Sequence, residues 1–144
     1  MSLAKFTARS LLSTIFITGG LGEVQKADQL SDAVDGLLEK LPELVRSQIS
    51  DVDSTLLVKV NGATMLAAGS LLALGIKPRL AATVLATQLV PVTAAGHAFW
   101  EKEGADKQGD QIQFCKNLGL IGGLLTVAPV SYTHLRAHET SLHL

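Results

Sequence analysis

The chain has 144 residues, which suits a single domain, and its 12 Lys and Arg residues nearly balance its 13 Asp and Glu residues. This balance, without a basic stripe that carries aromatic residues, argues against nucleic acid as a partner. Apolar residues make up 47% of the chain and charged residues only 17%, below the average of about 25% for soluble domains. The single cysteine, Cys115, excludes an internal disulfide and a redox pair, and we expect it to be a small buried residue.

Four stretches of 17 to 23 residues are poor in charge. A helix rises about 1.5 Å per residue, so crossing about 30 Å of hydrocarbon takes about 20 residues, with about 17 as the lower limit. Lys59 and the other charges in these stretches lie near the ends, where long side chains reach the interface. Ala63–Ile76 lacks the polar face of a soluble helix. The sequence therefore predicts an all-α, integral membrane four-helix bundle within residues 1–129, with spans at about 6–22, 54–76, 80–99 and 112–128.

Residues 23–53 separate the first two predicted spans and carry eight acidic residues against three Lys or Arg. Apolar side chains from Leu30 to Leu41 recur at i, i+4, i+7, i+8 and i+11, which places them on one face of a helix. Pro42 interrupts this pattern and can open a second short helix, Pro42–Ile49. We expect an amphipathic helical insert that lies on the outer membrane surface or caps the bundle, with partner binding as the alternative role.

Basic residues mark one side of the predicted bundle. Lys5 and Arg9 begin the first span, and Lys77 and Arg79 fill the turn between the second and third spans. The positive-inside rule makes this side cytoplasmic, so we expect a multi-pass protein of the bacterial inner membrane with a cytoplasmic N-terminus. The first span could also be read as a signal peptide, but it lacks a clear small-x-small cleavage site.

Small residues at four-residue spacing occur on three of the predicted spans. Helices in lipid associate by close backbone approach, so we expect Gly69, Gly119 and Gly123 to lie at helix contacts. The third span contains Pro91 and Gln88. We expect Pro91 to kink this helix and Gln88 to form a hydrogen bond with another helix.

The stretch HAFWEKEGADKQGDQIQFCKNLGLIGGLL, residues 97–125, resembles the signature end of the DoxX family. Residues 8–20 and 61–82 also fit, so the resemblance covers residues 3–128, with the 23–53 segment the least covered. It implies a small bacterial inner-membrane protein with four helices. The resemblance also implies one of two roles. Some relatives are associated with membrane oxidoreductases, and members of the wider superfamily act in protein sorting. The motif residues are Phe114, Lys116, Asn117, Leu118, Gly122, Gly123, Leu124 and Leu125.

The candidate site consists of polar residues toward the outer ends of the spans: Lys59, Asn61, His97, Lys116 and Asn117. One interpretation is a pocket for a quinone headgroup, whose carbonyls need donors and whose reduction needs protons that His97 could relay. The other is interface anchoring, with salt bridges to acidic residues between 101 and 110. No metal-ligand set or Ser-His-Asp arrangement is apparent in residues 1–129.

These features and the resemblance lead to one functional hypothesis and one alternative. We expect an accessory subunit of a quinone-linked membrane oxidoreductase rather than an enzyme by itself. Its expected partners are the lipid bilayer and a membrane or periplasmic oxidoreductase, and an oligomer is compatible with the sequence. The alternative is a membrane scaffold or sorting protein without a redox role.

The last fifteen residues differ in character from the rest, since they carry three of the four histidines and the only tyrosine. His134, His138 and Glu139 could be read as metal ligands. Back-translation gives a better explanation, because Val130–Thr140 resembles a translated transposase adapter of the kind used to build sequencing libraries. We therefore treat residues 130–144 as a non-native, disordered tail and leave them out of the fold prediction.

Overall fold

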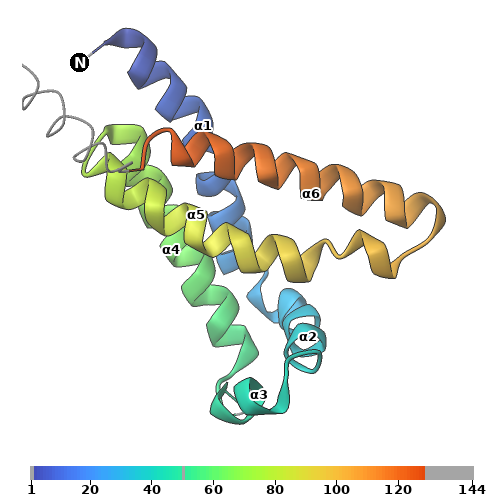
Figure 1. The fold of residues 1–144 in the computed structure, drawn as a ribbon. Coiled ribbons are helices and arrows are strands. Elements are labelled where there is room, and N and C mark those ends of the chain that lie inside the picture. Colours follow the sequence, from blue (N-terminus) through green and yellow to red (C-terminus); the bar gives the residue numbers. More distant parts are fainter. Residues whose placement is uncertain (1, 50, 129–144) are drawn as a thin grey trace, which may run out of the picture.

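The computed structural model describes residues 2–49 and 51–128, and the regular elements within them are all helical (Figure 1). The all-α prediction is confirmed, whereas the four-span membrane bundle stays a prediction. The tail that resembles an adapter lies outside the described residues. In chain order the elements are α1 (Leu3–Gln25), α2 (Ala27–Leu38), α3 (Glu43–Ile49), α4 (Ser54–Leu74), α5 (Pro78–Gly96), η1 (Phe99–Glu101) and α6 (Gly104–Leu125).

Local capping signals set the ends of the long helices. The Ser2 hydroxyl accepts a backbone N–H of the first turn of α1 at 3.3 Å, and the Asp53 carboxylate does the same for α4 at 3.0 Å. Helix α4 ends at Leu74 and is capped by Gly75, whose φ of 74° is the left-handed conformation that glycine adopts most readily. Pro78 then opens α5, where a missing N–H costs nothing. Another proline, Pro91, lies inside α5, and the helix continues past it to Gly96.

Helices α2 and α3 occupy the segment predicted as an amphipathic insert. The Ser54 hydroxyl donates a hydrogen bond to the Asp35 carboxylate and so ties α2 to the start of α4. Lys40 and Glu101 form an ion pair at 2.8 Å that ties the end of α2 to η1. Helix α3 has no buried residue. The insert is therefore attached to the rest of the protein through α2, whereas the side chains of α3 are not buried.

The four long helices are paired rather than evenly bundled. Helix α1 lies along α4 in the most extensive interface, and α5 packs against both α4 and α6. Figure 1 shows α5 and α6 as an antiparallel hairpin that diverges from α1 and α4. The N-terminus of α1, the α4–α5 turn and the end of α6 gather at one end of the molecule. The largest fully buried apolar side chains are Phe16, Leu72, Leu85 and Leu124.

Helices α1 and α4 approach most closely at two glycines. A Cβ added to Gly20 would lie 2.5 Å from the Gly62 carbonyl oxygen and 2.7 Å from the Leu66 nitrogen. A Cβ added to Gly62 would lie 2.8 Å from the Gly20 carbonyl oxygen. Because these contacts are with backbone atoms, a larger residue at either position would push the helices apart.

The three glycines predicted at helix contacts lie in different surroundings. A Cβ added to Gly69 would be 3.2 Å from the Phe16 Cβ on α1. At Gly123 it would be 3.5 Å from a Leu12 methyl group, also on α1, whereas at Gly119 it would meet nothing within 4 Å among the described residues. Two of the three glycines thus face α1, and Gly119 faces open space.

Large apolar side chains are exposed along all four long helices. Leu11 on α1 is 71% exposed and Leu118 on α6 is 52% exposed. By length and composition alone, two described segments could cross a membrane, Ser54–Leu74 and Pro78–Glu101, and only 28% and 35% of their apolar windows is buried. A core helix of a soluble protein would be mostly buried, so these apolar faces are suited to lipid.

Candidate functional site

A chain of polar side chains links α1, α4 and α5 within an otherwise apolar region. The Asn61 side-chain nitrogen donates to Glu23 Oε2 at 2.8 Å, and Gln88 Nε2 donates to Asn61 Oδ1 at 2.9 Å. Gln88 Nε2 also lies 3.3 Å from the Asn61 carbonyl oxygen. All three residues are half-buried. One residue from each helix therefore joins a single hydrogen-bonded network.

The carboxylate of Glu23 fixes the orientation of both amides. Its oxygen accepts a hydrogen bond, so Asn61 presents its NH₂ group to Glu23 and its oxygen to Gln88. Gln88 must then present its NH₂ group to Asn61, which leaves Oε1 on the far side. Gln88 Oε1 is buried and accepts no hydrogen bond from the part of the chain that the structure describes. A buried acceptor without a donor costs about 1–3 kcal/mol, so this atom is a weak point of the network.

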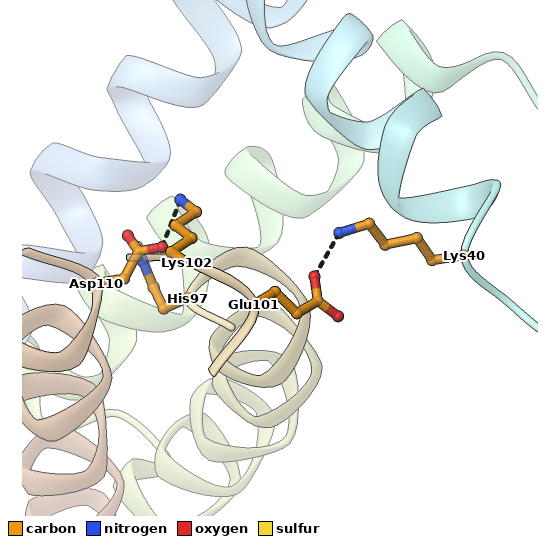
Figure 2. A network of polar contacts seen from close by, with 5 residues as sticks. All are labelled: Lys40, His97, Glu101, Lys102 and Asp110. Atoms are coloured by element: carbon orange, nitrogen blue, oxygen red, sulfur yellow. Dashed lines mark hydrogen bonds and ion pairs between the residues drawn. The ribbon is translucent and has the colours of Figure 1, made fainter. Parts of the chain in front are cut away.

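A second polar cluster lies where α5 and α6 meet (Figure 2). Lys102 Nζ is 2.5 Å from Asp110 Oδ2, and His97 Nδ1 is 3.4 Å from Asp110 Oδ1. The hydrogen bond from Lys102 lowers the pKa of Asp110 from its ordinary value of 3.8. The same contact raises the pKa of Lys102 from 10.5. Figure 2 also shows the neighbouring Lys40–Glu101 ion pair, which joins the segment just after α2 to η1.

Three aromatic rings reinforce this turn. Phe99 packs edge-on against Trp100 and Phe114, with ring centroids 5.2 and 5.4 Å apart, and Trp100 and Phe114 are 6.0 Å apart. Such pairs contribute about 0.5–1.5 kcal/mol beyond their buried area. Phe114, a residue of the predicted family motif, thus anchors α6 to η1. Gly122, another motif residue, is exposed.

The five predicted site residues lie in separate surroundings. Asn61 belongs to the network of α1, α4 and α5, whereas His97 belongs to the ion-pair cluster of the α5–α6 turn. Lys59 and Lys116 are exposed, Asn117 is half-buried, and no side-chain hydrogen bond or ion pair joins these three to the described residues. Within the described part of the chain no hydrogen bond or ion pair therefore unites the five as one pocket, and their shared role stays a prediction.

The expectation that Cys115 is buried is wrong, since its side chain is exposed. Cys115 lies on α6, which packs against α5 and η1 and contacts α1 only sparsely. The expectation assumed that a small apolar residue on a span is covered by neighbouring helices, and α6 has too few neighbours for that.

Comparison with models of known protein families assigns the chain to a family. The DoxX family model matches residues 4–98, about two-thirds of the 144 residues. The chain belongs to the DoxX family. A DoxX-family chain with two helices of membrane-spanning length and composition is a membrane protein. No curated protein and no solved structure matches the chain significantly.

The DoxX match spans α1 to α5 and so contains the Glu23, Asn61 and Gln88 network. The motif predicted in α6 lies outside it, so the family prediction is confirmed by residues other than that motif. The expected hydrogen bond from Gln88 to another helix is present. Glu23 was assigned to the outer insert and missed as the partner of Asn61. The sequence feature that could have indicated this network is that α4 and α5 each contain a single side-chain amide, Asn61 and Gln88.

Proposed function

We propose that this DoxX-family protein crosses the membrane four times and acts as an accessory subunit of a membrane oxidoreductase, with quinol bound at Gln88. The supporting observation is the buried Gln88 Oε1, which accepts no hydrogen bond from the described residues. The hydroxyl of a quinol would supply the donor that this acceptor lacks. The role is binding and positioning, and the partner enzyme performs the electron transfer.

Charge and hydropathy support four spans. Exposed apolar side chains on α1 and α6 suit lipid as well as those on α4 and α5 do. The basic residues near the N-terminus and in the α4–α5 turn favour a cytoplasmic position for that end of the molecule. Helices α2 and α3 and the α5–α6 turn then lie on the opposite, periplasmic side. This places the Glu23 end of α1 toward the outer half of the bilayer.

Gln88→Met tests the quinol site, because methionine has a similar length and offers no strong acceptor. Gln108→Met on α6 is the matched control, since Gln108 is exposed. Binding of a short-chain ubiquinol to nanodisc-embedded protein is measured by calorimetry. We expect Gln88→Met to weaken binding about tenfold, the effect of about 1.4 kcal/mol, and Gln108→Met to leave it unchanged. Equal binding by all three proteins would refute the quinol site.

The second candidate function, a scaffold or sorting role, is favoured by the open surface of α3. Leu44 is 79% exposed and Val45 is 45% exposed on α3, which lies in the insert expected at the outer membrane surface. Exposed apolar residues on such a helix are typical of a protein-binding surface.

Affinity capture from membranes separates the two functions. Wild-type protein and the Leu44→Ser, Val45→Ser double variant are captured, and the retained proteins are identified by mass spectrometry. Recovery of oxidoreductase subunits with both proteins supports the accessory role. Recovery of non-redox envelope proteins that the double variant loses supports the scaffold role.

A further inference from the structure

A pocket of about 340 Å³ is lined by residues of α1, of the start of α5 and of the segment that follows α6. Figure 1 shows that these three parts of the chain meet at one end of the molecule. This volume reaches the range of about 300–1,000 Å³ that is typical of small-ligand sites. Among the described residues that line it, the charged ones are all cations: Lys5, Arg9 and Arg79.

The positive charge of this pocket has no carboxylate nearby among the described residues. Residues 2–22, 54–100 and 111–128 contain no Asp or Glu. The acidic residues before the tail all lie in residues 23–53 and 101–110, toward the other ends of the helices. Neither the Lys5 ammonium nor the Arg79 guanidinium forms an ion pair or hydrogen bond with the described part of the chain. The pocket therefore attracts an external anion.

The backbone around the pocket adds to this attraction. Helix α5 begins with Pro78, has no side-chain cap at Lys77 and has no acidic residue in its first turn. The positive end of its dipole and the N–H groups that follow Pro78 thus remain available at the Arg79 side of the pocket. A Cβ added to Gly75 would lie 2.9 Å from an Arg9 terminal nitrogen, so the Arg9 guanidinium is packed against the end of α4.

We propose that this pocket binds the phosphate group of an anionic phospholipid. Phosphate oxygens accept hydrogen bonds from guanidinium and ammonium groups, and a basic pocket between the helices of a membrane protein suits a lipid headgroup. The apolar side chains of Leu12 and Val127 line the same pocket and can contact the glycerol and the first carbons of the acyl chains. Free phosphate presents the same oxygens and is the other source of this chemistry.

Replacing two cations by neutral residues of similar length tests the proposal. The variant Lys5→Gln, Arg79→Gln is compared with the control variant Lys26→Gln, Lys107→Gln, whose lysines are exposed and lie outside the pocket. Native mass spectrometry measures the retention of added phosphatidylglycerol by the full chain in detergent, with phosphatidylcholine as the uncharged comparison. We expect the pocket variant to bind phosphatidylglycerol about 25-fold more weakly, because each of the two cations at an anionic surface contributes about fivefold. The control variant should bind as the wild type does.

Two further arms identify the source of the phosphate and guard against misfolding. Arg79→Lys keeps the charge and should retain most of the binding, which a variant that merely disturbs the fold would not do. If inorganic phosphate binds with the same dependence on Lys5 and Arg79 while phosphatidylglycerol binds no better than phosphatidylcholine, free phosphate is the source. If neither probe depends on Lys5 and Arg79, or if the control variant loses as much binding, the proposal is overturned.

Discussion

The substitution Gly20→Ala probes the closest contact between α1 and α4. The added Cβ would lie 2.5 Å from the Gly62 carbonyl oxygen and 2.7 Å from the Leu66 nitrogen, so α1 and α4 must move apart. Overpacking costs about 1–3 kcal/mol, and the rigid backbone contact places this case near the upper limit. Alanine regains about 1 kcal/mol of helix propensity. We therefore expect a net destabilisation of about 2 kcal/mol, close to a 30-fold change in the folding equilibrium.

Gly22→Ala is the matched control on the same helix. A Cβ at Gly22 would meet nothing within 4 Å, so only the helix propensity changes, and stability should rise by up to about 1 kcal/mol. Unfolding in mixed micelles is followed by the loss of far-ultraviolet circular dichroism as the mole fraction of sodium dodecyl sulfate increases. If the Gly20→Ala and Gly22→Ala proteins unfold at the same mole fraction, the close contact between α1 and α4 is refuted.

Three further predictions use the same unfolding assay. Asn61→Leu should lower the free energy of unfolding by about 1–2 kcal/mol, because Glu23 and Gln88 each lose their hydrogen bond to the Asn61 side chain. The control Asn117→Leu should have almost no effect. The contribution of the Lys102–Asp110 pair to the stability difference between wild type and Asp110→Asn should be retained from pH 3.8 to 10.5. It should vanish as the pH falls through the lowered pKa of Asp110, or as it rises through the raised pKa of Lys102, because either change removes one charge of the pair. Lys40→Gln should cost less than about 1 kcal/mol, because its ion pair with η1 is exposed; a larger loss would mean that this contact orders α2.

The helices could be predicted from sequence because their signals are local. The apolar spacing from Leu30 to Leu38 falls on α2, although the pattern continues to Leu41 beyond its end, and Pro42 directly precedes α3. The long charge-poor stretches coincide with α1, α4, α5 and α6, although the helices begin and end several residues away from the predicted spans. Capping residues such as Asp53 and Gly75 set those ends, and apolar runs alone do not reveal them.

The candidate site was less predictable because it depends on how the helices cross. The hydrogen bond between Asn61 and Glu23 exists because Gly20 and Gly62 allow α1 and α4 to touch, and no spacing within one helix encodes that contact. Lys59 is only two residues from Asn61, yet a rotation of two helical positions turns it away to an exposed face.

Membrane topology tests the central claim, that the chain crosses the bilayer four times with its N-terminus inside the cell. Single cysteines are placed at Ser2, Ser47, Ile76 and Lys107 in a Cys115→Ser background, and intact cells are treated with a membrane-impermeant maleimide. The account predicts labelling at positions 47 and 107 in intact cells, and at positions 2 and 76 only after lysis. Labelling of positions 2 and 47 from the same side, or release of the protein from membranes by carbonate, would contradict it.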